Sequence, residues 1–191
     1  MKLLDLIKAN RSYRRFHEDQ PVGFETLKSL IELARLSPSA RNAQSLKFHI
    51  ATNRDLLIKV FPCLTWAGYI KDWPGPKEGE RPTGYITILN DKNISQNYFC
   101  DHGIAAQSIL LGAVERGFGG CIIAAINREK LAKVLNLPDH LEILLVLAVG
   151  TPNESIIIEK LHHPEDTKYW RTADEIHHVP KRDLDDIILH E

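Results

Sequence analysis

Apolar residues recur along this chain with helical and strand spacing. The spacing predicts strands over residues 47–52, 85–89, 121–123 and 141–149, and helices over 2–10, 24–36, 54–61, 97–116 and 128–136. The last strand is almost continuously apolar, which is typical of burial on both faces. The order does not fit regular alternation of strands and crossover helices, and no G-x-G-x-x-G follows a strand, so a Rossmann domain is not expected. The pattern favours an α+β sandwich, with helices around a mixed or antiparallel central sheet.

Two long stretches lack a clear period. Residues 64–82 contain three prolines, three glycines and the aromatic residues Trp66, Tyr69 and Trp73. A loop of this length is usually functional or disordered, and its aromatic content argues against disorder. Residues 151–191 show little helical periodicity, yet apolar residues within them need burial. We therefore expect residues 151–191 to form an extended arm that packs on a partner subunit.

The composition is that of an ordinary globular protein. At 191 residues, with 43% hydrophobic and 26% charged residues, the chain is expected to form one domain over 1–191. The formal net charge of −1 gives no indication of binding to nucleic acid or an anionic membrane. No apolar run approaches the roughly 20 residues of a membrane span, and no signal-peptide pattern opens the chain, so cytoplasmic residence is expected.

The cysteines and histidines do not predict a metal or redox site. Cys63, Cys100 and Cys121 are widely spaced and form no C-x-x-C motif, so we expect them to be reduced and buried. Histidines are paired at 162–163 and 177–178, but adjacent residues of a strand point to opposite faces. No acidic residue lies at a recognised ligand spacing around them, and no metal is expected.

A basic cluster follows the first predicted helix. Arg11, Ser12, Arg14 and Arg15 lie within five positions of one another. Arginine side chains match phosphate oxygens bidentately, and a serine hydroxyl can add a hydrogen bond, so the cluster is a candidate phosphate site. The alternative is a solvated basic helix end, where cations complement the C-terminal dipole. The cluster alone leaves both interpretations open.

Several motifs in order along the chain resemble the nitroreductase family of flavin mononucleotide (FMN) enzymes. The first two are R-S-x-R-x-F at 11–16 and S-P-S-x-x-N-x-Q at 37–44. The segments 101–107 and 117–121 resemble the central helix of that family and its following glycine turn. Residues 145–152 resemble its last core strand, and 179–184 its C-terminal basic segment. The resemblance weakens over 61–81 and 153–178.

The resemblance implies a cofactor site made of several segments. The FMN phosphate and the near edge of the flavin would be held by Arg11, Ser12 and Arg14, with Arg15 as a further contact and Lys181 and Arg182 reaching the phosphate from the tail. Residues of the other protomer would pack against the isoalloxazine ring, namely Pro38, Ser39 and Ala40. Two amide residues would either bond the ring and ribityl chain or fix the loop, namely Asn42 and Gln44.

Two further segments are implied for the ring and the substrate. The family presents backbone amides to flavin N5 at the turn occupied here by Ile123, Ala124 and Ala125. Some relatives carry an acidic residue where this chain has Ala124, so one tuning group is absent. The pocket wall or lid would come from Trp66, Tyr69 and Trp73, for which ordinary packing of a long loop is an equal alternative.

The implied function is an NAD(P)H-dependent FMN oxidoreductase, an obligate homodimer with its sites at the subunit interface. A reduced nicotinamide would pass hydride to flavin N5, and a nitroaromatic, quinone or enone would take the electrons by a ping-pong mechanism. No dedicated catalytic side chain is then needed. The alternatives are a dehalogenase or flavin-fragmenting relative on the same fold, an FMN-binding carrier or sensor without turnover, and a phosphate-binding regulatory domain without flavin. The sequence decides neither the acceptor nor NADH against NADPH.

Overall fold

The computed structural model describes residues 1–70, 73–163 and 165–189, and its contacts fall into two compact units. Unit 1 comprises residues 1–66 and 74–153, and unit 2 comprises 67–73 and 154–191. Each unit is described by itself. The expectation of one domain over 1–191 stays a prediction.

Unit 1 is built on a four-stranded sheet in which every pairing is antiparallel. The strand order is β1-β2-β4-β3, and the strands span Leu46–Ala51 (β1), Gly84–Asp91 (β2), Gly119–Ile123 (β3) and Leu141–Gly150 (β4). All residues of β2 are buried, as are the last eight of β4, so the two central strands are covered on both faces. Of the two predicted alternatives, mixed or antiparallel, the antiparallel sheet is the one found. The predicted burial on both faces holds for 143–149, whereas Leu141 is half-buried and Glu142 is exposed.

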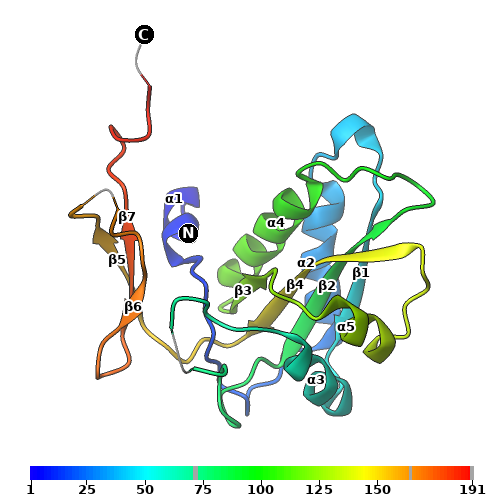
Figure 1. Ribbon diagram of the computed structural model, residues 1–191, viewed down its shortest axis with the longest axis horizontal. Helices are drawn as coiled ribbons and strands as arrows, with labels where there is room; N and C mark the ends of the chain where they lie inside the picture. Colours follow the sequence, from blue (N-terminus) through cyan, green and yellow to red (C-terminus); the bar gives the residue numbers. More distant parts are fainter. Residues whose placement is uncertain (71–72, 164, 190–191) are drawn as a thin grey trace. The chain divides into compact units, whose positions relative to one another are not determined.

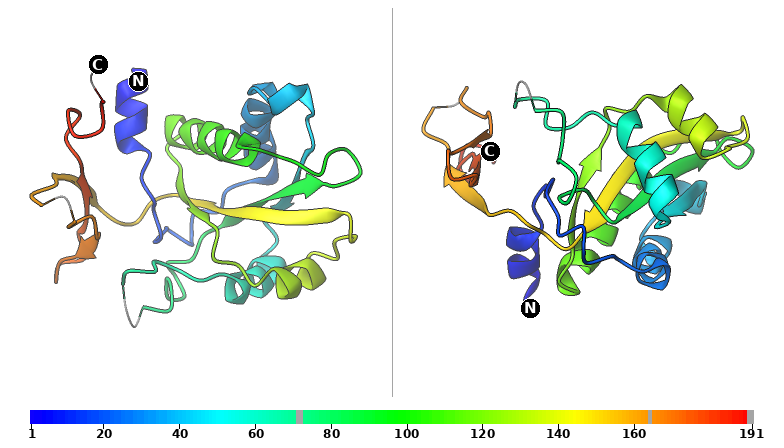
Figure 2. Two further views of the ribbon diagram at one scale, coloured as in Figure 1. Left: turned by 45° about the horizontal axis from the view of Figure 1, so that its top comes forward. Right: turned by 90° about the horizontal axis from the view of Figure 1, so that it is seen from below.

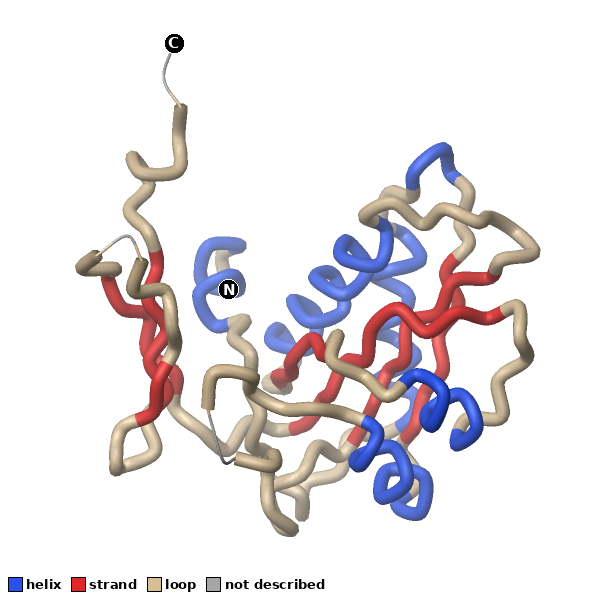
Figure 3. Tube along the Cα trace, viewed as in Figure 1, coloured by secondary structure: helices blue, strands red, loops and turns tan. Residues whose placement is uncertain are grey.

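Helices cover both faces of this sheet (Figures 1 and 2). One face carries α2 (Phe24–Leu36) and α4 (Asp101–Glu115), and the other carries α3 (Arg54–Val60) and α5 (Arg128–Val134). Two short 3-10 turns, Ala40–Asn42 (η1) and Phe61–Cys63 (η2), link these elements, and loops make up much of the remaining chain (Figure 3). The predicted α+β sandwich is therefore confirmed.

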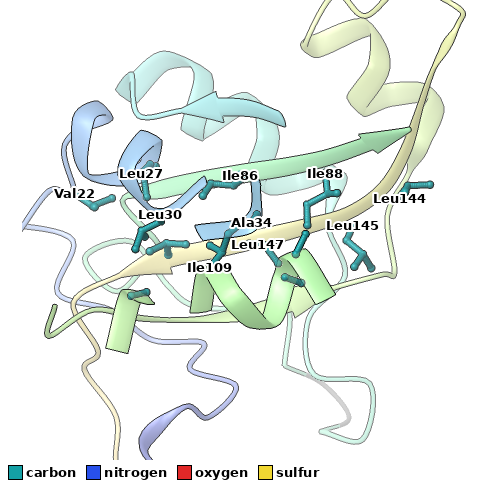
Figure 4. Packing of buried hydrophobic residues seen from close by; sticks show 14 residues of the cluster. Val22, Leu27, Leu30, Ala34, Ile86, Ile88, Ile109, Leu144, Leu145 and Leu147 are labelled. Carbon is teal, nitrogen blue, oxygen red and sulfur yellow. The ribbon is translucent and has the colours of Figure 1, made fainter. Parts of the chain in front are cut away.

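The main core of unit 1 lies between the sheet and the α2–α4 layer (Figure 4). Leu27, Leu30 and Ala34 of α2 are buried at helical spacing, and they pack with Ile109 of α4 and Leu147 of β4. This spacing places the three α2 residues on one face of the helix, as its apolar stripe predicts. The sheet face and the two helices therefore hold each other in place.

Side-chain caps fix the starts of two helices. The Asn53 side chain accepts hydrogen bonds from the backbone amides of Asp55 (3.0 Å) and Leu56 (3.4 Å) at the start of α3. Asn127 accepts one from Lys130 (3.1 Å) at the start of α5. These bonds satisfy amides that have no partner inside the helix.

The start of α4 differs from the sequence expectation. The helix was predicted from residue 97, but it begins at Asp101. Phe99 has a φ of 45°, a left-handed conformation that an α-helix cannot continue through. Upstream, Ser95 bonds both the carbonyl and the amide of Asn97 and so holds a turn. The buried carboxylate of Asp101 therefore sits at the first turn of α4.

The cysteine expectation is wrong at one position. Cys63 and Cys121 are buried, and burial raises the pKa of the Cys63 thiol, which keeps it protonated at neutral pH. Cys100 is exposed, because it precedes α4 at the displaced helix start. None of the three cysteines forms a disulfide bond among the described residues.

Unit 2 contains a small sheet that the sequence analysis did not predict. Its order is β5-β7-β6, with β5 (Ile156–Lys160) parallel to β7 (His177–Lys181) and β6 (Trp170–Arg171) antiparallel to β7. Parallel pairing joins residues far apart in sequence, and β6 has two residues, so no local pattern marks it. The stretch expected to be an arm without regular structure is therefore partly a sheet.

A buried ion pair and aromatic contacts hold unit 2 together. The Arg171 guanidinium lies 2.9 Å from the Glu154 carboxylate, and the two side chains are 9% and 1% exposed. The same guanidinium lies 4.6 Å from the centre of the Trp73 ring. Tyr69 packs on Tyr169, with ring centroids 5.1 Å apart. Part of the long loop predicted over 64–82 therefore belongs to the C-terminal unit.

Candidate functional site

The basic segment after α1 (Leu3–Ala9) is extended and is fixed to the start of β3. Ser12 forms an isolated parallel bridge with Gly120, and the Tyr13 amide donates to the Gly120 carbonyl at 3.1 Å. The Asn10 side chain donates to Gln107 of α4 at 3.3 Å. The backbone contacts with Gly120 and the contact with α4 thus fix the position of the segment that carries the arginines.

The arginines of this segment differ in their partners. Arg15 pairs with Glu80 at 3.5 Å, and both side chains are mostly buried. Arg14 donates to the Ser12 carbonyl at 3.2 Å. Arg11 donates through Nη2 to the Ile7 carbonyl at 2.9 Å, which is the helix-end contact of the alternative interpretation.

One donor of Arg11 makes the phosphate interpretation stronger. Its Nε is buried and has no hydrogen-bond partner among the residues that the structure describes. A buried polar group left without a partner costs about 1–3 kcal/mol, and more for a charged one. Ser12, the next residue of the segment, is exposed. An anion bound here would satisfy the orphaned donor, so the residues present fit a phosphate.

The loop over 37–44 has an unusual backbone. Arg41, Asn42 and Gln44 have φ values of 55°, 51° and 51°. Each such residue costs roughly 1–3 kcal/mol, and persists only where the surroundings impose it. Strained backbone of this kind is concentrated at functional sites, which agrees with the role that the resemblance implies for this loop.

A single carboxylate binds this loop at two points. Asp101 accepts a hydrogen bond from the Ser39 hydroxyl through Oδ2 (2.7 Å) and from the Ala40 amide through Oδ1 (3.0 Å). The Gln44 amide in turn donates to Ser39 Oγ at 3.0 Å. The Gln44 side chain donates to the Asn42 carbonyl at 3.4 Å, which supports a loop-fixing role for Gln44.

A pocket of about 350 Å³ lies beside this loop. It is bounded by α2, the loop, β1 and the first turns of α4, and its apolar lining includes Ile31, Ala34, Leu46, Phe48 and Ala105. Pro38, Ser39 and Gln44 border it from the loop. Three of the predicted cofactor residues thus line one concavity of unit 1.

The turn after β3 contains residues 123–125, for which the family resemblance implies a contact to flavin N5. Ile123 is the buried last residue of the strand, while Ala124 and Ala125 are exposed. The Ala125 carbonyl accepts a hydrogen bond from the Thr65 amide at 2.9 Å, which fixes the turn to the start of the long loop.

The three aromatic pocket candidates have different environments. Trp66 is 4% exposed, stacks on Phe61 at 5.6 Å, and leaves no room at Gly75, where an added Cβ would lie 2.6 Å from its ring. This geometry favours the packing alternative for Trp66. Tyr69 and Trp73 belong to unit 2, and Tyr69 is 57% exposed.

The two basic residues of the tail also belong to unit 2. Lys181 is the last residue of β7 and Arg182 follows it, and both side chains are exposed. Within the described part of the chain, no group of three or more His, Cys, Asp or Glu residues could hold a metal ion. No helix among those residues is long and apolar enough to cross a membrane.

Within unit 1, the predicted residues form two groups at different points along α4. The arginine segment lies against Gln107 and the start of β3, and the 37–44 loop lies against Asp101. Six residues of helix separate Asp101 from Gln107, about 9 Å along the axis. The sequence analysis missed Asp101 and Glu80, which position these groups. The only signal for Asp101 was its place at the head of the 101–107 motif.

Comparisons with known proteins agree with this geometry. The model of the nitroreductase family matches residues 7–151. A protein of Methanothermobacter thermautotrophicus with the provisional name NADH dehydrogenase/NAD(P)H nitroreductase is 26% identical over 172 residues, covering 86% of this chain and 85% of its own.

Two solved structures share the fold. An FMN-dependent nitroreductase from Clostridium difficile R20291 is 23% identical with a TM-score of 0.67, covering 86% of this chain and 94% of its own. A nitroreductase family protein from Streptococcus pneumoniae TIGR4 is 20% identical with a TM-score of 0.69, covering 100% of both chains. The family match over most of the chain, together with this fold, establishes that the protein belongs to the nitroreductase family of oxidoreductases.

Proposed function

We propose that this protein is an FMN-dependent oxidoreductase that passes electrons from NAD(P)H to a small acceptor such as a nitroaromatic, a quinone or an enone. The observation that carries the proposal is the buried Nε of Arg11, which has no hydrogen-bond partner among the described residues and belongs to the residue before the exposed Ser12. The NAD(P)H in the name of the Methanothermobacter relative and the FMN in that of the Clostridium structure support the choice of both cofactors.

The phosphate of FMN would be held by the basic segment of unit 1. Arg11 and Arg14 supply the charge, and Ser12 adds a neutral donor. Arg15 contributes less, because Glu80 already compensates its charge. Lys181 and Arg182 are proposed as further phosphate contacts from the tail.

The flavin ring would contact the strained loop of the other protomer and the turn after β3. Pro38, Ser39 and Ala40 offer a short, small-residue surface for a planar ring, and the exposed Asn42 side chain supplies an amide for its polar edge. Ile123, Ala124 and Ala125 would face the opposite edge, and Tyr69 and Trp73 are the candidates for the substrate wall.

Bound FMN would supply the two-electron chemistry, which no side chain of this chain can carry. The protein residues would bind and orient the cofactor and keep water from its reactive edge. Since the electrons pass through the cofactor, the site needs no general acid or base among its side chains. This proposal accordingly assigns no catalytic residue.

We also propose a homodimer, because both units expose apolar side chains that a monomer would leave in water. No residue of α1 is buried, and Leu3 and Leu4 are 67% and 63% exposed. In the tail, Leu184, Ile187 and Ile188 are 66%, 62% and 44% exposed. Burying such side chains stabilises by about 1.5–3 kcal/mol each, enough in sum to drive association.

Removing residues 183–191 is expected to convert the dimer to monomers at micromolar concentration. The cut leaves β7 intact, so the sheet of unit 2 remains, while the apolar tail that would pack on the partner is lost. Sedimentation velocity measures the change. Removal of 190–191 alone is the control and should leave the dimer unchanged. A truncated protein that stays fully dimeric would contradict the role of the tail.

The visible absorbance spectrum of the purified protein tests the proposed function. We expect a flavin spectrum that bleaches on anaerobic addition of NADH or NADPH and returns on addition of a quinone or nitroaromatic. A flavin spectrum that neither nucleotide bleaches would indicate a carrier or an enzyme fed by another reductant. A protein that stays colourless after incubation with FMN would refute the proposal.

A further inference from the structure

We propose that Asp101 is the positioning residue of the cofactor site, and that its carboxylate sets the 39–44 loop in the shape that receives the flavin. This inference rests on the proposed function. It gives a role to Asp101, to which neither the 101–107 motif nor the phosphate chemistry assigned one, and which need not touch the cofactor.

The contacts of Asp101 are directed at the loop. Asp101 is 4% exposed, and its two oxygens accept from the Ser39 hydroxyl and the Ala40 amide. Through Ser39 Oγ, which accepts from the Gln44 amide, the same carboxylate also controls the far end of the loop. One side chain thus ties together both ends of the six-residue loop 39–44.

The buried negative charge of Asp101 depends on the loop for its stabilisation. A buried carboxylate needs several hydrogen bonds, or its desolvation is uncompensated. Asp101 lies in the first turn of α4, where the helix dipole favours a negative charge. The Ser39 hydroxyl and the Ala40 amide supply the hydrogen bonds that the carboxylate needs, so the loop and the carboxylate stabilise each other.

The shape imposed is one that the loop would not keep by itself. Arg41, Asn42 and Gln44 all stand in the left-handed region without being glycine. Removing the carboxylate would leave the Ser39 hydroxyl and the Ala40 amide without an acceptor and would release this strain. The loop is then expected to relax to a different average structure, which would move Pro38, Ser39 and Ala40 away from their flavin-binding positions.

The loop offers a direct probe of its shape, independent of any cofactor. Arg41 is exposed and provides a trypsin site within the turn. In the FMN-free protein, Asp101→Ala is expected to raise the rate of cleavage after Arg41 about tenfold, since each charge-assisted bond lost favours the open loop. Ser39→Ala should also raise it, and the double variant should be cleaved more slowly than the product of the two single effects predicts, because both single variants lose the bond between Ser39 and Asp101.

The second measurement is the affinity for FMN, by quenching of flavin fluorescence. Asp101→Ala should weaken binding about tenfold. Asp101→Asn keeps the shape of the side chain and one acceptor oxygen. Its cleavage rate and its FMN affinity should lie between those of Asp101→Ala and the native protein, and it remains informative if Asp101→Ala does not fold. The control is Asn53→Ala, which also loses two backbone hydrogen bonds and should lower the melting temperature without changing either readout.

The outcomes separate this inference from the proposed function. Cleavage after Arg41 at the native rate in both Asp101 variants would overturn the positioning role, whatever the cofactor. A loosened loop with unchanged FMN affinity would show that the loop is not a flavin contact and would overturn the inference equally. If the native protein binds no FMN, the proposed function fails, while the protease measurements still decide whether Asp101 sets the loop.

Discussion

Replacing both Arg11 and Arg14 by alanine is expected to abolish FMN binding at micromolar concentration. Each charge-assisted hydrogen bond to a phosphate is worth about 1.5–3 kcal/mol, or more than tenfold in affinity, so the pair should account for a hundredfold or more. The two side chains stand on a segment fixed to Gly120 by the backbone. The loss should therefore come from the missing guanidinium groups and leave the fold intact.

Fluorescence titration of the FMN-free protein measures this effect, and circular dichroism checks the fold. Single variants should each weaken binding by more than tenfold. Lys47→Ala with Lys133→Ala is the matched control, because it removes two exposed cations elsewhere in unit 1. It should leave the affinity nearly unchanged, since exposed charges at a distance are screened by salt. An unaltered affinity in the double arginine variant would refute the phosphate assignment.

Helices and strands with strong apolar periodicity were predictable from the sequence. The α2 stripe gave both ends of that helix, since Pro38 stops the pattern and three buried residues recur at its spacing. The caps that Asn53 and Asn127 form at the starts of α3 and α5 depend on adjacent residues alone. Local interactions fix these elements, so local patterns reveal them.

Features that depend on distant residues were not predictable in this way. The parallel pairing of β5 with β7 joins segments about twenty residues apart, and the Arg171–Glu154 pair closes the same unit. The predicted start of α4 was wrong because the residue type at Phe99 does not indicate a left-handed backbone. The motif at 37–44 could be recognised from the sequence, because it is local. The dependence of this loop on Asp101 joins distant residues and became visible only in the structure.

The arginine segment shows the same division within the candidate site. Its residue types pointed to phosphate, and the family resemblance placed Arg15 as a further contact beside Arg11 and Arg14. In the structure Arg15 has a carboxylate partner, whereas Arg11 keeps a buried donor without one. That contrast supports the lower rank of Arg15 as a phosphate ligand, so the double variant pairs Arg11 with Arg14.

The second large effect is expected at Gly120, where the fold and the candidate site meet. A Cβ at this position would lie 2.3 Å from the Ala148 carbonyl oxygen and 2.9 Å from the Leu110 side chain. The oxygen belongs to the backbone of β4 and cannot give way without breaking the β3–β4 pairing. Gly120→Ala should therefore destabilise the protein by about 2–3 kcal/mol, a loss of roughly 5–10 °C in melting temperature.

Gly120→Ala should also weaken FMN binding, because the Gly120 carbonyl holds the Tyr13 amide and so positions the arginines on either side of it. Thermal unfolding followed by circular dichroism, and the same fluorescence titration, measure the two effects. Gly103→Ala is the control: Gly103 lies in α4, where an added Cβ meets no atom within 4 Å. It should raise stability by about 0.5–1 kcal/mol, since alanine is the better helix former. Equal melting temperatures for Gly120→Ala and Gly103→Ala would mean that β3 can shift without loss of stability. The contact with Gly120 would then not be what fixes the position of the arginine segment.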